Sequence, residues 1–132
     1  MRITADTNVL VRAVVEDHAE QSKIAQSTLR RAELIAISIP ALCELVWVLA
    51  QGYKIPSSEI AETIRRLINA ANVVVNRPTA EAGLAHLDAG GDFADGAIAY
   101  EGNWLGADTF VSFDKKAVRL MEARGESAQL LT

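Results

Sequence analysis

The chain has 132 residues, half of them hydrophobic, and a formal net charge of −4 at pH 7. This is the length of one domain with a sizeable core, so we expect a single domain over residues 1–132. An overall acidic chain is not a protein that coats nucleic acid along its whole surface, because such proteins are basic.

The first half of the chain alternates predicted strands and helices. The spacing of apolar residues predicts, in order, a strand at 2–5, helices at 8–15 and 20–31, a strand at 34–37 and a helix at 41–51. For the last helix, Pro40 marks the first turn and Gly52 the end. A further helix follows, with Ser57 as its expected N-cap. The apolar run at 34–37 is typical of a buried strand.

The second half continues this alternation. In order, it predicts a strand at 73–75, a helix from a Thr79 cap to about residue 89, a helix opened by Asp92 after Gly90-Gly91, a strand at 109–113, a helix at 115–123 and an edge strand at 129–131. Strands that alternate with helices predict an α/β fold with a parallel sheet and helices on both faces.

The cellular compartment is predicted from features that the sequence does not contain. Its one cysteine, Cys43, excludes an internal disulfide and fits a reducing cytoplasm. No apolar signal segment follows Met1, and no apolar run is long enough to span a bilayer. We therefore expect a cytoplasmic protein without membrane contact.

Four acids stand beside strand ends or helix starts: Asp6, Glu44, Asp95 and Asp114. Ligands bind at the carboxyl edge of open α/β sheets, and one edge can collect all four. Asp6 has the alternative of capping the helix that follows it. Glu44 lies in an apolar stretch, so we expect a buried charge that needs a partner or a metal; the alternative is a side chain that points to solvent or pairs with an arginine. Asp92 is either an N-cap or a fifth acid.

Converging carboxylates need a cation. A pair about 4 Å apart repels by about 1 kcal/mol in water and by about 4 kcal/mol at an effective dielectric of about 20. The two histidines, His18 and His86, lie far from each other, and no zinc-type spacing of histidine and cysteine exists. Oxygen ligands suit Mg²⁺ or Mn²⁺, which activate water and stabilise a leaving oxygen in phosphodiester hydrolysis.

The segments Asp6-Thr7-Asn8-Val9-Leu10, Asp92-Phe93-Ala94-Asp95 and Ser112-Phe113-Asp114, with Glu44 between them, resemble the PIN-domain ribonucleases, and more narrowly the VapC toxins of bacterial toxin–antitoxin pairs. The resemblance implies a PIN-like three-layer fold and RNA cleavage with Mg²⁺ or Mn²⁺ held by the four acids. It also implies a homodimer and a VapB-type antitoxin, which inhibits the toxin and brings operator DNA binding. Asn8 and Ser112 match small polar positions beside the family's metal site. The chain departs from the pattern at Gly96 and Ala97, where Ala or Leu is expected after the acid, and the glycine lowers helix propensity at that turn.

Three cations directly follow Asp114: Lys115, Lys116 and Arg119. They are candidate phosphate contacts for RNA near the metal, and the alternative is a solvated helix face.

Three alternatives stay open. A receiver-like signalling domain shares the size, the parallel sheet and a magnesium-binding acid cluster, but it needs two adjacent acids after the first strand, where this chain has Asp6-Thr7-Asn8. A haloacid-type phosphatase needs an acid at Asn8. A non-catalytic PIN module that binds RNA or a partner is the third alternative.

Overall fold

All strand pairs in the structure are parallel, as the alternation of strands and helices predicts. The computed structural model describes residues 1–132. By its internal contacts the chain divides into two units, Met1–Arg77 and Pro78–Thr132. The prediction of one domain over 1–132 therefore stays a prediction, and each unit is described by itself.

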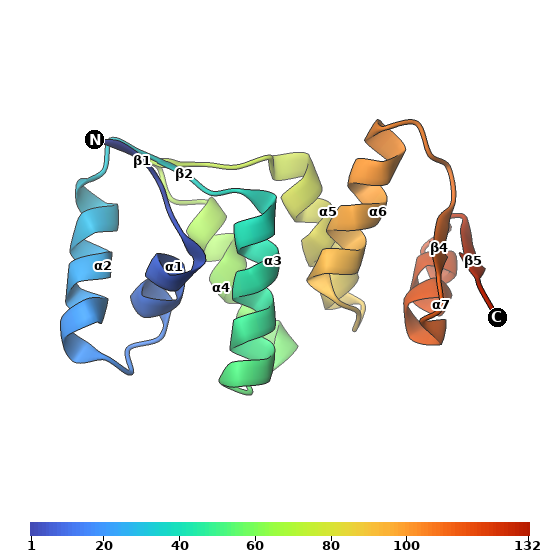
Figure 1. The fold of residues 1–132 in the computed structure, drawn as a ribbon, viewed down its shortest axis with the longest axis horizontal. Helices are drawn as coiled ribbons and strands as arrows, with labels where there is room; N and C mark the ends of the chain where they lie inside the picture. The colour runs from blue at the N-terminus through green and yellow to red at the C-terminus, as the bar shows by residue number, and fades with distance from the viewer. The chain divides into compact units, whose positions relative to one another are not determined.

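The first unit is a three-stranded sheet with four helices. Its elements are β1 (Arg2–Thr4), α1 (Thr7–Val14), α2 (Ala19–Arg31), β2 (Leu34–Ala36), α3 (Ile39–Trp47), the π-helical turn η1 (Val48–Gly52), α4 (Ser57–Ile68) and β3 (Val73–Val74). The strand order is β1-β2-β3, with Ile3 beside Ile35 and Ile35 beside Val73. In Figure 1, α1 and α2 lie side by side. Fully buried aliphatic residues form the core: Leu10, Leu42, Leu45, Leu49, Ile60, Ile64 and Ile68.

The second unit joins three helices to a smaller parallel sheet. Its elements are α5 (Arg77–Asp88), which begins at the unit boundary, α6 (Phe93–Trp104), β4 (Phe110–Ser112), α7 (Lys115–Ala123) and β5 (Ala128–Leu130). Strands β4 and β5 pair with each other, and α7 packs on both of them (Figure 1). The fully buried side chains include Leu84, Phe93 and Met121.

Three predicted helix boundaries are wrong. Pro56, with extended backbone, holds the N-cap position of α4, so Ser57 is already helical. Helix α5 begins at Arg77 instead of after a Thr79 cap, because Pro78 is tolerated in a first helical turn, and Thr79 is buried inside the helix. The helix predicted at 41–51 is α-helical only to Trp47 and continues as the π-helical turn η1.

Candidate active site

Asp6 lies directly beyond the carboxyl end of β1. The ladder ends at Ala5, whose N–H donates to the carbonyl of Ala36 at 3.1 Å. Asp6 holds the N-cap position of α1 with extended backbone, but its side chain makes no capping hydrogen bond. The capping alternative is therefore wrong for the carboxylate, which is exposed and available to a ligand.

Glu44 is exposed, so the expected buried charge is wrong. Helix α3 starts at a Ser38 cap whose Oγ accepts from the N–H of Ala41 at 3.2 Å. The helix buries Leu42, Leu45 and Val46, and the helical period leaves Glu44 on the opposite, solvent side. Residues that are neighbours in the sequence of a helix lie on different faces of it, so the apolar residues around Glu44 did not imply that Glu44 itself is buried.

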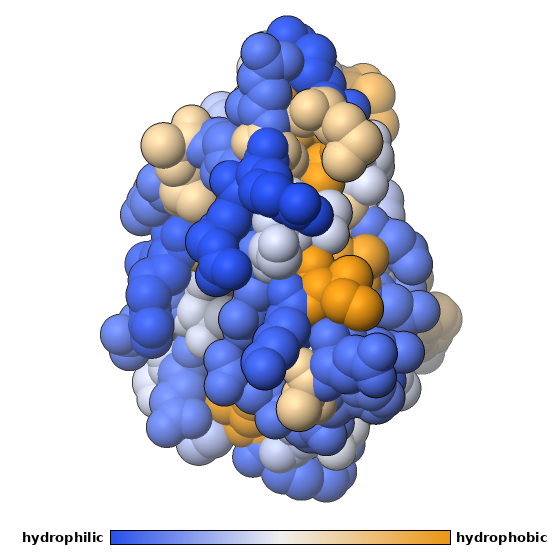
Figure 2. All heavy atoms as spheres, turned by 90° about the vertical axis from the view of Figure 1, so that its left-hand side faces the viewer, coloured by the Kyte–Doolittle hydropathy of each residue, from blue (hydrophilic) through white to orange (hydrophobic).

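Asn8 is exposed on α1 and lines an open hollow of about 600 Å³ between α1 and α2. The hollow is polar at Arg12 and Gln21 and apolar at Val9 and Ile24. Figure 2 looks at the side of the molecule that carries α2, and this face is mostly hydrophilic with a compact apolar patch. Asn8, two residues after Asp6, thus lines a hollow that has both polar and apolar walls.

Asp92 and Asp95 share the first turn of α6. Asp92 is the N-cap, and its Oδ1 accepts from the N–H of Ala94 at 3.3 Å, which confirms the capping interpretation. Asp95 is half-buried. Burial, and then the negative charges of Asp92 and Asp114, raise the pKa of Asp95. The charge of Asp95 is therefore disfavoured by its burial and by the two neighbouring acids of the same unit.

Asp114 follows β4 and caps α7. Its Oδ1 accepts from the N–H groups of Lys116 at 2.9 Å and Ala117 at 3.2 Å. The N–H of Asp114 in turn donates to Ser112 Oγ at 3.0 Å. The hydroxyl of Ser112 thus holds the short turn that carries Asp114, a supporting contact that its sequence position did not indicate.

The cations after Asp114 are exposed on α7: Lys115, Lys116 and Arg119. Lys115 and Lys116 stand in the first turn of that helix. Their positions are open to a polyanion and equally to solvent, so both alternatives from the sequence remain.

The predicted acid set is divided between the two units. Asp6 and Glu44 belong to the first unit, and Asp92, Asp95 and Asp114 belong to the second. No three acid, histidine or cysteine side chains converge closely enough to hold a metal ion. A centre made of all the predicted acids therefore stays a prediction, although their oxygen donors fit a hard divalent cation.

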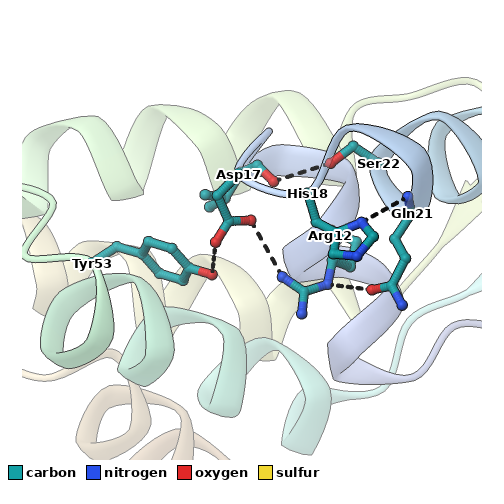
Figure 3. Close-up of polar contacts among 7 residues, drawn as sticks. Arg12, Asp17, His18, Gln21, Ser22 and Tyr53 are labelled. Carbon is teal, nitrogen blue, oxygen red and sulfur yellow. Dashed lines mark hydrogen bonds and ion pairs between the residues drawn. The ribbon is translucent and has the colours of Figure 1, made fainter.

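A polar network in the first unit has no counterpart in the sequence interpretation (Figure 3). Arg12 donates from Nε to Gln21 Oε1 at 2.7 Å and forms an ion pair with Asp17 at 3.2 Å. Asp17 also accepts from the hydroxyl of Tyr53 at 2.8 Å. The network fixes two side chains of the α1–α2 hollow. Tyr53 is 36 residues from Asp17, so no local pattern connects them.

Gly96 departs from the expected pattern because α5 comes too close for a side chain. A Cβ there would lie 2.6 Å from the carbonyl oxygen of Ala82 and 2.6 Å from the Cβ of His86. Gly83 on α5 is equally tight, since its Cβ would lie 2.7 Å from the ring of Phe93. The two glycines permit the close crossing of α5 and α6, one residue after Asp95.

The comparisons with known proteins give a family. No curated protein matches the chain. None of the helices has the length and apolarity that a membrane span requires. The model of the PIN domain family matches residues 3–122, which run through both units. PIN domains are generally nucleases and typically use divalent metals. With an α/β fold, parallel strands and a match over most of its length, the chain belongs to the PIN domain family.

Proposed function

We propose that this PIN domain is a metal-dependent endoribonuclease that hydrolyses RNA phosphodiesters. The observation that carries the proposal is the match of the PIN domain family over residues 3–122, and it is supported by the charges of Asp92 and Asp114, which add to burial in raising the pKa of Asp95. Acids that repel one another in a half-buried place fit a bound cation better than a purely structural role. The family supplies the class of reaction, since PIN domains are generally nucleases.

The proposed ligands of Mg²⁺ or Mn²⁺ are Asp6 and Asp95, with Asp114 and Glu44 completing the set. Asp6 is suited to this because its exposed carboxylate makes no capping bond. Asp92 and Asp114 each commit one oxygen to a helix cap, which orients the carboxylate and leaves the other oxygen for the ion or its hydration shell. The ion, when bound, supplies the acidity that activates water and the charge that stabilises the leaving oxygen. No histidine is proposed as a base.

The substrate contacts are proposed on α7. Lys115, Lys116 and Arg119 are exposed and follow Asp114 within five residues, so a phosphate held by the first two would lie close to Asp114. An acidic protein needs such a local basic patch to hold RNA.

The biological role proposed is that of the toxin in a type II toxin–antitoxin pair. Its support is the resemblance of the Asp6–Leu10 and Asp92–Asp95 segments to VapC-type toxins. The proposal includes a cytoplasmic homodimer, a VapB-type antitoxin that inhibits it, and operator DNA that only the antitoxin contacts.

The test is cleavage of total tRNA and rRNA by the purified chain with Mg²⁺, with Mn²⁺ and with chelator. We expect discrete products that disappear with chelator and with Asp6→Asn. Asp108→Asn is the matched control, because Asp108 is an exposed acid in the α6–β4 loop, outside the proposed set. Cleavage that persists in Asp6→Asn would contradict the ligand assignment. Metal binding without cleavage of any RNA would favour a non-catalytic PIN module, and stable labelling by a small phosphodonor would favour a receiver-like domain.

A further inference from the structure

His86 is a fully buried histidine in the second unit that the proposed chemistry does not use. It lies on α5, and its Nδ1 is 3.2 Å from Nη1 of Arg124, which follows α7 directly. A guanidinium only donates hydrogen bonds, so Nδ1 is the acceptor and a neutral ring carries its proton on Nε2. Nε2 has no hydrogen-bond partner.

The ring of His86 packs against the turn before α6. A Cβ at Gly91 would overlap Nε2 of His86. The N–H of Gly91 also donates to the carbonyl of His86 at 2.9 Å. Both the backbone and the side chain of His86 therefore meet Gly91.

His86 also meets the other end of the same short segment. A Cβ at Gly96 would lie 2.6 Å from the Cβ of His86. Gly91 and Gly96 enclose the first turn of α6, which carries Asp92 and Asp95. His86 thus contacts the backbone immediately before Asp92 and immediately after Asp95.

We propose that His86 is a positioning residue. Its side chain, held by Arg124, packs against Gly91 and Gly96 and so fixes the positions of the carboxylates of Asp92 and Asp95. The inference rests on the proposed metal site for its functional meaning, but the contact it describes does not depend on that site. Residues that orient metal ligands typically contribute about 10–100-fold to metal affinity.

The protonation of His86 agrees with this role. Burial, followed by the positive charge of Arg124, lowers the pKa of His86, and the charges of Asp92 and Glu126 oppose this less strongly. The ring is therefore neutral at pH 7 and acts by its shape and by its bond to Arg124.

The experiment measures Mn²⁺ affinity by electron paramagnetic resonance, together with amide hydrogen exchange, in four variants. These are His86→Ala, Gly91→Ala, the double variant, and Leu84→Ala as control. Leu84 is as fully buried as His86 on the same helix but is not among the atoms nearest to Gly91 or Gly96. The amides of Asp95 and Gly96, which bond to the carbonyl of Asp92, report the order of the acid-bearing turn.

We expect His86→Ala to weaken Mn²⁺ binding by about tenfold or more. It should also speed exchange of the Asp95 and Gly96 amides, whereas Leu84→Ala should lower thermal stability and leave affinity within about twofold of wild type. Gly91→Ala should weaken binding more strongly in the wild-type background than in His86→Ala, since the overlap with the ring is then gone and only the tight contact with Leu120 Cδ1 at 3.0 Å remains. Equal effects of Gly91→Ala in both backgrounds, or a His86→Ala affinity no lower than that of Leu84→Ala, would overturn the inference.

The experiment distinguishes failure of the proposed metal site from failure of the positioning role of His86. If the wild-type chain binds no Mn²⁺, the proposed metal site is wrong, and the exchange of the Asp95 and Gly96 amides alone decides the positioning role. Faster exchange in His86→Ala than in Leu84→Ala then supports it, and equal exchange overturns it. His86→Gln is a second variant should His86→Ala not fold, because its amide retains a polar group toward Arg124 and should restore part of the affinity.

Discussion

The hydroxyl of Tyr53 donates a 2.8 Å hydrogen bond to Oδ2 of Asp17, which joins the end of η1 to the loop between α1 and α2 (Figure 3). This hydrogen bond is the main reason why the pKa of Asp17 is lowered, with Arg12 adding to it. It also raises the pKa of Tyr53. The network is thus an acid-sensitive connection in the first unit.

Tyr53→Phe should raise the pKa of Asp17 back toward its ordinary value of 3.8. Because the folded-state pKa lies below the unfolded one, the stabilisation by Asp17 is present above the unfolded pKa and is lost as pH falls through the folded value. Carboxyl NMR titration of wild type and Tyr53→Phe measures the shift directly. An unchanged Asp17 pKa in the variant would contradict the hydrogen bond as its cause.

Asp95→Asn should make the metal-free protein more stable at pH 7 while abolishing cleavage. The pKa of Asp95 is raised above 3.8 in the folded state. At pH values between the unfolded and the folded pKa, the folded state therefore holds a proton that the unfolded state has lost. Stability therefore falls as pH rises from the unfolded pKa through the folded one, and this loss is complete above that window. Calorimetry with chelator should give a higher Tm for the variant at pH 7 and a difference that closes below about pH 4. A lower Tm at pH 7 would argue against crowded negative charge at this position.

Two substitutions separate the roles of Asp114. Asp114→Ala removes the cap of α7 and should lower the free energy of unfolding by about 1 kcal/mol. Asp114→Asn keeps an oxygen for the N–H groups of Lys116 and Ala117, so stability should change little while metal-dependent cleavage is lost. Urea unfolding and RNA cleavage of both variants measure this. Full cleavage by Asp114→Asn would remove Asp114 from the ligand set.

Gly96→Ala should destabilise the fold by about 1–3 kcal/mol, although alanine is the better helix former. Its Cβ would meet the backbone carbonyl of Ala82, which cannot rotate away. Gly102 on the same helix is the matched control, because a Cβ there meets nothing within 4 Å. Gly102→Ala should stabilise by up to about 1 kcal/mol, and destabilisation of similar size at both positions would contradict the close crossing of α5 and α6.

Reversing the charge of Lys115 and Lys116 should weaken RNA binding and flatten its dependence on salt. For single strands, each phosphate contact contributes about 0.7 to the slope of log K against log salt. The slope should therefore fall by about 1.4 if both lysines contact phosphate. Reversal of Arg30 and Arg31, exposed cations at the end of α2, is the control. An unchanged slope for the lysine variant would assign these side chains to solvent.

The sequence by itself determined the order and type of the elements, because apolar periodicity and local capping decide them. The predicted strands and helices and the cap at Asp92 rest on neighbours within a few residues, and the structure contains them, with three helix boundaries displaced. The four-acid centre was predicted from the same local positions, and it stays a prediction because its members fall in two units.

Only the tertiary structure decided what is buried and what touches across the sequence. It exposed Glu44, left the Asp6 carboxylate out of a cap, buried His86 against Gly91 and joined Tyr53 to Asp17. The glycine at position 96 has its reason in the nearby backbone carbonyl of Ala82, which leaves no space for a side chain. These outcomes depend on residues from other elements, and propensity or periodicity along one segment carries no information about such contacts.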